Sequence, residues 1–192
     1  MMVIGLTGNI ASGKSTISSH LSEKGYDIID ADMISRYIME PGQEGYLGVL
    51  RVFGLQYLLP DGSIDRKKLG EDVFSSPVKL KMLNDLTHPI IVSAIEDELK
   101  TSKSEVTVID APLLKQVGLE RLCDEVWIVT VDDKIRLKRL MDRNGYSREE
   151  ASRRMSSQEK IQVAEGDIIF ENNGSVEELI YKVDKRLREL SL

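Results

Sequence analysis

The sequence predicts an α/β protein built around a parallel sheet of five strands. The apolar run Val3–Thr7 leads through a glycine-containing turn into helical spacing. Two runs rich in β-branched residues, Thr107–Ile109 and Val126–Val131, have the composition of buried parallel strands, and each is followed by an acid. The apolar segment Ile168–Phe170 could be a further strand. Strands that alternate with helices pair in parallel, and 192 residues suffice for one well-buried core with a small insertion.

The first quarter of the chain repeats the alternation of strand and helix. Helical spacing begins at Lys14 and continues toward Gly25. The segment Tyr26–Asp30 then predicts a second short buried strand. A helix is expected over Met33–Met39, because Pro41-Gly42 would end it.

The middle of the chain, Gly45–Lys100, differs because helical periodicities occur there without a convincing strand. Turn-forming residues interrupt it at Pro60-Asp61-Gly62, at Ser75-Ser76-Pro77 and at His88-Pro89. We therefore expect a mostly helical insertion, with His88 at the start of a helix in a structural rather than a catalytic role.

Two helices of the C-terminal third are marked by capping boxes. Ser147 is followed by Glu150, and Ser175 is followed by Glu178. The first of these helices is expected to run to about residue 158. The second is amphipathic and should dock on the core.

Composition narrows the classes of partner. The chain carries 26 Lys and Arg against 32 Asp and Glu, a net charge of −6, which argues against DNA as the main partner. It contains no apolar run of about 18 residues, and its first residues lack the pattern of a signal peptide. Cys123 is the only cysteine, so an intrachain disulfide is excluded. We expect a soluble, cytoplasmic protein that binds neither nucleic acid nor membrane.

The segment Gly8–Ser15 fits the phosphate-binding pattern G-x-x-x-x-G-K-[ST]. In this pattern backbone N–H groups surround a phosphate, and the following helix directs its positive end toward it. Gly8 and Gly13 permit close approach of the backbone, because a Cβ would obstruct it. Lys14 brings a charge to the β and γ phosphates, and the Ser15 hydroxyl ligates Mg²⁺. Since the pattern follows a strand and opens a helix, we expect a nucleotide-binding phosphate loop.

The phosphate loop alone does not separate a kinase from a GTPase or a regulatory ATPase. A GTPase should carry Asn-Lys-x-Asp, which is absent, and Asp110–Leu113 lacks the glycine of a switch loop. Instead, Asp30 and Asp32 end the second strand, at the edge of a parallel sheet where ligands bind. A carboxylate there can accept a hydroxyl proton, as in kinases. The alternative is that both acids cap the helix that follows.

Segments along nearly the whole chain resemble the dephospho-CoA kinase family in order and spacing. They are Gly5–Gly8, the phosphate loop, Asp30-Ala31-Asp32-x-Ile34, His88-Pro89-x-Ile91 and Asp110–Leu114. Three later segments are similar to the lid and the nucleotide side of that family: Arg139-x-x-x-Arg143-x-Gly145, Arg154 with Gln158, and Asn172–Ser175. Such an ensemble is much more specific than the loop itself.

The chain departs from the family pattern at a few positions. Asn9 and Ala11 stand where the family usually has glycine, and neither is a residue that the phosphate cradle requires. Lys115-Gln116 replaces an aromatic-acidic pair, and Phe170-Glu171 replaces an aliphatic-acidic step. These differences bear on substrate affinity rather than on the reaction.

The resemblance implies a three-layer phosphate-loop kinase fold with a helical acceptor subdomain and a helical lid. The single kinase domain would consist of a core over residues 1–40, 104–135 and 164–192, an acceptor insertion over about 41–103 and a lid over about 136–163. The helical insertion would contact the pantetheine side of the acceptor.

The resemblance also implies the reaction. The γ-phosphate of ATP would pass to the ribose 3′-hydroxyl of dephospho-CoA, giving CoA and ADP with Mg²⁺ present, the last step of coenzyme A biosynthesis. Asp32 would be the base, Lys14 and the amides of residues 11–16 would hold phosphates, and Ser15 would bind the metal. Asp110 would reach the metal through water, unless it caps a helix or turn. The expected nucleotide-binding residues are Gly8, Ala11, Ser12, Gly13, Lys14, Ser15, Thr16 and Asn173.

A cluster of basic side chains supports a lid that closes over phosphates. It comprises Lys134, Arg136, Lys138, Arg139, Arg143, Arg148, Arg153 and Arg154. Arg139 and Arg143 are four residues apart, so they can lie on one helical face and approach the same phosphates. The alternative is a solvated helix face. Trp127 is expected in the core, and the turn Asn172–Ser175 beside adenine.

Two other functions remain open. A different small phosphate-loop kinase, acting on a nucleoside, nucleotide or metabolite, would share the fold and the loop. A regulatory nucleotide-binding module would share them without transfer, although it would need neither Asp32 nor the pair Arg139 and Arg143. We expect a monomer or a weak homo-oligomer.

Overall fold

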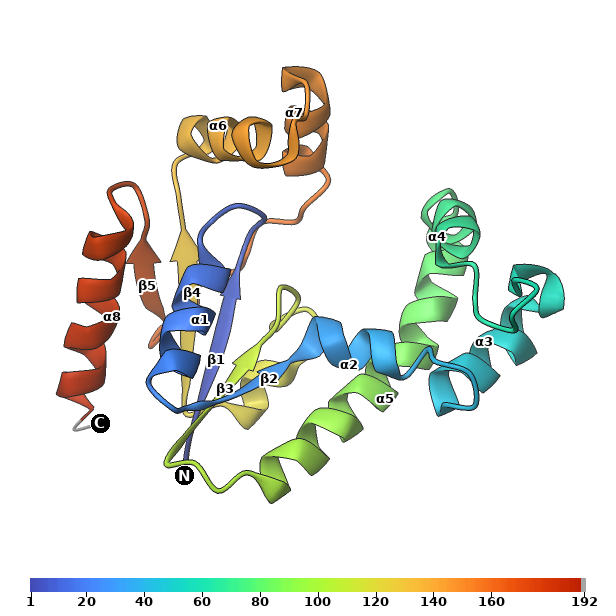
Figure 1. Cartoon of the computed structure of the whole chain (residues 1–192), viewed down its shortest axis with the longest axis horizontal. Helices are drawn as coiled ribbons and strands as arrows, with labels where there is room; N and C mark the ends of the chain where they lie inside the picture. The colour runs from blue at the N-terminus through green and yellow to red at the C-terminus, as the bar shows by residue number, and fades with distance from the viewer. Residues whose placement is uncertain (191–192) are drawn as a thin grey trace. The chain divides into compact units, whose positions relative to one another are not determined.

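A computed structural model of the chain describes residues 1–190 and divides the chain into two compact units. The first unit joins residues 1–29 to the part of the chain from residue 102 onward, and the second spans residues 30–101. Figure 1 labels the elements of both units. The first unit carries the sheet and the phosphate loop.

The sheet has five strands in the order β2-β3-β1-β4-β5. The strands are β1 (Met2–Gly8), β2 (Asp27–Asp30), β3 (Val106–Asp110), β4 (Glu125–Thr130) and β5 (Ile168–Glu171). β1 pairs in parallel with both β3 and β4, and β4 pairs in parallel with β5. The predicted five-stranded parallel sheet is confirmed. Parallel pairing brings the residues that follow these strands to one edge of the sheet, where ligands bind in such folds.

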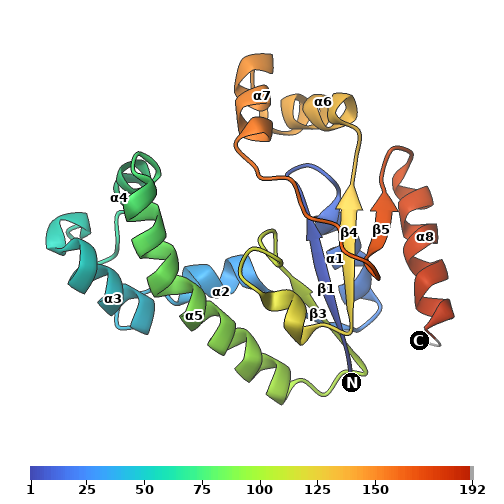
Figure 2. The same cartoon turned by 180° about the vertical axis from the view of Figure 1, so that it is seen from behind.

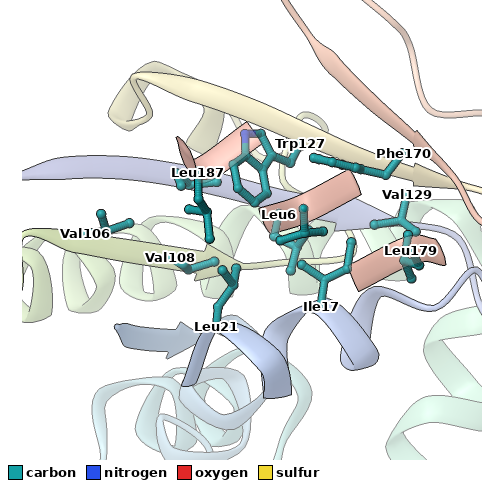
Figure 3. Close-up of a cluster of buried hydrophobic side chains, with 12 residues drawn as sticks. Leu6, Ile17, Leu21, Val106, Val108, Trp127, Val129, Phe170, Leu179 and Leu187 are labelled. Atoms are coloured by element: carbon teal, nitrogen blue, oxygen red, sulfur yellow. The ribbon is translucent and has the colours of Figure 1, made fainter. Parts of the chain in front are cut away.

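One face of the sheet is covered by α1 (Lys14–Glu23) and α8 (Val176–Glu189), as Figures 1 and 3 show. The sheet and these two helices enclose a buried hydrophobic cluster. It contains Ile4, Leu6, Ile17, Leu21, Val106, Val108, Trp127, Val129, Phe170, Leu179, Val183 and Leu187. Trp127 is 0% exposed, and its ring lies edge-on to Phe170 with 5.0 Å between the ring centroids. Trp127 therefore belongs to the core, as predicted.

The opposite face of the sheet packs against connecting segments. A Cβ added at Gly5 would lie 2.7 Å from Cys123 Sγ and 2.9 Å from Leu114 Cδ1. The Thr7 hydroxyl donates to the Pro112 carbonyl on the same face. The segment between β3 and β4, which carries Pro112, Leu114 and Cys123, includes the 3₁₀ helix η2 (Leu119–Leu122). Figure 2 shows this segment on the same side as the chain that runs from α7 across the sheet to β5.

Two helices follow β4 in the first unit. They are α6 (Asp133–Asn144) and α7 (Arg148–Ser156), and α7 begins where the Ser147 hydroxyl accepts a hydrogen bond from Glu150 N–H. The predicted N-cap at Ser175 has the same form, because its hydroxyl accepts from Glu178 N–H at the start of α8.

The second unit is helical. It contains α2 (Ala31–Tyr37), α3 (Glu44–Phe53), the 3₁₀ helix η1 (Leu55–Tyr57), α4 (Arg66–Phe74) and α5 (Pro77–Thr101). Its own core consists of Val49, Phe53, Tyr57, Ile64, Leu69 and Val73. In the described residues no helix is both long and apolar enough to cross a membrane.

The predicted interruption at His88-Pro89 is wrong, because both residues lie inside the 25-residue helix α5. Proline removes one backbone N–H from a helix and crowds the preceding turn, but tertiary packing can outweigh this cost. α5 contacts α2, α3 and α4 of its unit, and Ile95 and Leu99 are buried. Pro77, by contrast, is the first residue of α5, where proline is favoured.

Candidate active site

The phosphate loop connects β1 to α1 in the first unit, as the sequence pattern predicts. Gly13 has a φ of 105°, a left-handed conformation that L side chains rarely adopt. A Cβ on Gly13 would lie 2.1 Å from Asn172 Nδ2, and a Cβ on Gly8 would lie 2.5 Å from Ser12 Oγ. Both glycines are therefore required by close approach of neighbouring groups.

Ala11 is the described non-glycine residue with a positive φ, 61°. An L residue in this conformation is strained by about 1–2 kcal/mol relative to the right-handed region. The family resemblance places glycine at this position, and the backbone conformation supplies the physical reason. The loop of this chain therefore carries strain that glycine would relieve.

Lys14 and Asp110 form an ion pair between the start of α1 and the end of β3. Their side chains are only 18% and 8% exposed, so solvent screens the pair weakly. The two predicted site residues meet because β3 lies beside β1 in the sheet. A carboxylate thus stands next to the ammonium group that the pattern assigns to the phosphates.

Asn172 joins the end of β5 to the phosphate loop. Its side-chain Nδ2 donates to the Ser12 carbonyl at 2.7 Å, and its backbone N–H donates to the Thr130 carbonyl at 2.8 Å. Asn172 is 5% exposed. The family resemblance assigned the turn that contains Asn172 to the nucleotide side of the site. No local sequence pattern indicated that Asn172 contacts the phosphate loop.

Gln158 contacts the phosphate loop from another direction. Its Oε1 accepts a hydrogen bond from Ile10 N–H at 2.9 Å, across 148 residues of sequence. Farther along the same segment, Asp167 pairs with Lys115, one of the residues that depart from the family pattern. Both side chains are largely buried, with 15% of Lys115 and 7% of Asp167 exposed. The segment between α7 and β5 is therefore attached both to the phosphate loop and to the segment that follows β3.

Two of the loop amides predicted to hold phosphate take part in turns. Ser12 N–H donates to the Asn9 carbonyl and Thr16 N–H to the Gly13 carbonyl, each at 3.0 Å. These bonds fix the curvature of the loop. The roles of Gly8, Ala11, Ser12, Gly13, Ser15 and Thr16 in nucleotide binding stay predictions.

The predicted lid arginines differ in their surroundings. Arg139 Nη2 donates to the Asn172 carbonyl at 3.0 Å and to Asn172 Oδ1 at 3.3 Å. Arg143, near the end of α6, is exposed. Asn173 Oδ1 accepts from Asp132 N–H at 2.8 Å, which joins the turn before α8 to the start of α6. Arg139 thus contacts Asn172, which belongs to the turn predicted beside adenine, and the roles of Arg139, Arg143 and Asn173 stay predictions.

Asp30 and Asp32 have different positions at the start of α2. Asp30 is the N-cap, and its Oδ1 accepts from Asp32 N–H at 2.8 Å and from Met33 N–H at 3.0 Å. This cap starts the helix at Ala31, two residues before the predicted start. Asp32 is exposed in the first turn and belongs to the second unit. The capping alternative holds for Asp30, and the role of Asp32 as a base stays a prediction.

The described residues contain no group of three or more His, Cys, Asp or Glu side chains that could enclose a metal ion. Mg²⁺ in phosphotransferases needs no such cage, because one or two protein oxygens and the substrate phosphates hold it. Ser15 in the first turn of α1 and Asp110 beside Lys14 are an oxygen donor set of this kind. The residues present fit a phosphate-bound Mg²⁺.

Comparisons with known proteins identify the family. The family model for dephospho-CoA kinase matches residues 2–178. Dephospho-CoA kinase of Carboxydothermus hydrogenoformans is 46% identical over 182 residues, covering 91% of this chain and 87% of that protein. Its counterpart from Oceanobacillus iheyensis is 42% identical and covers 100% of this chain and 98% of that protein.

The fold agrees with this match. The structure of dephospho-CoA kinase from Campylobacter jejuni aligns with a TM-score of 0.71 at 30% identity, over 98% of this chain and 96% of that one. A gluconokinase from Sinorhizobium meliloti, 14% identical with a TM-score of 0.57, shares the fold alone. The matches cover nearly the full length, and they agree with the phosphate loop and the five-stranded parallel sheet. This chain belongs to the dephospho-CoA kinase family.

Proposed function

We propose that this protein transfers the γ-phosphate of ATP to the ribose 3′-hydroxyl of dephospho-CoA, giving CoA and ADP. The proposal rests on one observation above all. A complete phosphate loop, with Lys14 paired to Asp110, occurs in a chain whose family model spans residues 2–178. The reaction would complete the biosynthesis of coenzyme A.

The donor half of the proposed site is the phosphate loop. Lys14 and backbone N–H groups of the loop would hold the β and γ phosphates, since N–H groups at a helix start favour anions. When nucleotide binds, the Lys14 ammonium group would either leave Asp110 for the phosphates or contact both Asp110 and the phosphates. Phosphoryl transfer depends mainly on such positioning and on neutralisation of charge.

Bound Mg²⁺ would neutralise the charge that develops on the transferring phosphate. Ser15 would ligate it directly, and Asp110 would hold it through water. The contact between Asp110 and Lys14 supports this assignment, because it brings a largely buried carboxylate to the loop.

The acceptor half depends on Asp32. Its carboxylate would orient the 3′-hydroxyl and accept its proton as the oxygen attacks phosphorus. The position of Asp32 supports this role, because it places an exposed carboxylate in the first turn of α2, directly after the N-cap Asp30. The helical unit that carries Asp32 would supply further acceptor contacts.

Arg139 and Arg143 would act on the nucleotide from α6. Arg139 would border adenine or neutralise phosphate charge, and its contact with Asn172 supports a position beside the loop. Arg143 would approach phosphates when the proposed lid over about 136–163 closes. Asn173 would border the adenine. A cytoplasmic location and a monomeric or weakly associating state complete the proposal.

An assay of ADP release with ATP and Mg²⁺ tests the acceptor. Dephospho-CoA should support turnover, whereas nucleoside monophosphates and shikimate should not. Turnover with another acceptor and none with dephospho-CoA would favour a different small-molecule kinase. Nucleotide binding without turnover on any acceptor would indicate a regulatory module.

A further inference from the structure

A cavity of about 600 Å³ lies beside the phosphate loop in the first unit. Its wall is formed by Asn9 and Ser12 of the loop, the end of β4, the helices α6 and α7, and residues from the segment 158–163. The wall shares Ser12 with the proposed phosphate cradle but contains none of Lys14, Ser15 and Asp110, so the cavity lies beside the cradle and does not coincide with it. Neither Arg139 nor Asn172 lines it.

Two buried polar atoms in this wall have no hydrogen-bond partner within the described residues. They are Arg136 Nε and Ser12 Oγ. Arg136 is 7% exposed and Ser12 is 1% exposed. Buried polar atoms are nearly always hydrogen-bonded, because leaving one unpaired costs the desolvation of that group. The two residues that carry these atoms line one cavity, and a ligand bound there could supply a partner that the chain does not.

The contacts of Arg136 hold its guanidinium at the wall. Nη2 donates to the Met155 carbonyl at 3.1 Å, and Nη1 donates to Asp133 Oδ1 at 3.4 Å. The Asp133 side chain is 81% exposed, so this second contact is strongly screened. A guanidinium has only donors, and its unpaired Nε–H therefore calls for an acceptor.

The rest of the wall defines the class of ligand. Its charged side chains are Arg136 and Lys160 against Asp133, which leaves one net positive charge, two minus one. Apolar side chains also line it: Ile128, Val129, Val131, Met155, Ile161 and Val163. Pockets for small organic ligands have about this size and this mixture of apolar wall and few polar groups.

We propose that this cavity binds a small organic anion, with a carboxylate or phosphate group on Arg136 and an apolar part against β4 and α7. Ser12 and Gln158 line the cavity, and Gln158 also holds Ile10 N–H of the loop. The ligand would therefore touch the loop that is proposed to receive the nucleotide. This proposal does not depend on the identity of the phosphate acceptor.

Nuclear magnetic resonance of the ¹⁵N-labelled full chain tests the proposal at Arg136 itself. Saturating MgADP first fills the phosphate cradle. The probes are 4-fluorobenzoate for a carboxylate, phenyl phosphate for a phosphate, and uncharged 4-fluorobenzamide as a matched control. We expect at least one acid to shift the Arg136 Nε–H signal saturably, with a Kd of about 1 mM or tighter, and the amide to leave it unchanged.

Three variants distinguish binding inside the cavity from binding on the exposed surface of α6. Arg136→Lys keeps the charge but lacks Nε, and it identifies the signal by its loss. Ser152→Trp places a bulky ring at an exposed position of the wall, so this variant should still fold. The ring should weaken binding of the acid at least tenfold, whether the acid is 4-fluorobenzoate, detected by ¹⁹F, or phenyl phosphate. Lys138→Leu removes an exposed charge from the same helix outside the wall, and binding should persist.

Three results would overturn the proposal. If neither acid shifted the Arg136 signal, water alone would fill the cavity. Binding of the amide as tight as that of the acids would exclude an anion site. Loss of the effect of the acids in the presence of MgADP would assign them to the phosphate cradle.

Discussion

The side chain of Asn172 donates a 2.7 Å hydrogen bond to the main-chain carbonyl of Ser12, across 160 residues of sequence. This contact joins the end of β5 to the phosphate loop. Arg139 contacts both the carbonyl and the side-chain oxygen of the same Asn172. The conformation of the loop and the position of α6 are therefore linked through one buried asparagine.

Replacing Asn172 by alanine should weaken nucleotide binding. Asn172→Ala removes the donor to a buried carbonyl, which costs about 1–3 kcal/mol. Because the loop amides lose their fixed arrangement, the Kd for MgADP should rise by about tenfold for each 1.4 kcal/mol. Isothermal titration calorimetry measures this change.

Asn144→Ala is the matched control, because Asn144 is exposed at the end of α6. It should leave the Kd unchanged. Equal affinity of Asn172→Ala and the unmodified protein would show that the loop does not depend on this contact.

Glycine at position 11 should stabilise the protein. Ala11→Gly removes the left-handed strain at a φ of 61°, and this gain exceeds the entropy cost of glycine by about 0.5–1 kcal/mol. Urea unfolding measures the difference. Ala164→Gly is the control, since its φ is not positive and glycine there should only destabilise. A loss of stability on Ala11→Gly would contradict the strain.

Stability should depend on the ionised Glu125 carboxylate. Burial alone would raise the pKa of Glu125, but hydrogen bonds from Arg186 and Trp127 outweigh it and lower that pKa below its ordinary value of 4.5. Because the pKa is lower in the folded state, the ionised carboxylate stabilises the fold when the pH is above the ordinary pKa. This contribution is lost as the pH falls through the folded-state pKa. Glu125→Gln should cost roughly 1–2 kcal/mol at pH 7.

Urea unfolding of both proteins between about pH 3 and pH 7 checks this sign. The difference in unfolding free energy should shrink as the pH falls below 4.5. The exposed Glu165→Gln should show almost no difference at any pH. A difference for Glu125→Gln that did not change with pH would rule out the ion pair as its source.

In the proposed mechanism the acceptor chemistry depends on Asp32. Asp32→Asn keeps the shape of the side chain but cannot accept the hydroxyl proton, so kcat should fall by roughly 10²-fold or more. The Kd for MgADP should stay unchanged, because Asp32 would serve the acceptor and not the nucleotide. Asp30→Asn keeps a side-chain oxygen for the helix cap and should lose far less activity. Near-normal kcat for Asp32→Asn would remove Asp32 from the mechanism.

Features set by local sequence could be predicted well. The phosphate loop follows from eight consecutive residues, and Trp127 could be assigned to the core because a β-branched run surrounds it. The caps at Ser147 and Ser175 were recognisable for the same reason, since partner and cap lie three residues apart. In each case the deciding interactions lie within a few residues.

Features set by tertiary packing could not be predicted. The proline pattern indicated a break at Pro89, yet α5 continues through it because its surroundings stabilise the helix. The contacts of Asn172 with Ser12 and of Gln158 with Ile10 join segments that no local pattern connects. Arg136 belonged to a basic cluster in the sequence, and only the fold buries it.

Identification of the reaction product tests the central proposal most directly. The purified protein is incubated with dephospho-CoA, Mg²⁺ and ATP labelled in its γ-phosphate, and the product is analysed by mass spectrometry and ³¹P NMR. The account predicts CoA with the label in a 3′-phosphate monoester, formed in equal amount to ADP. Label that remained in ATP or appeared only in inorganic phosphate would contradict it.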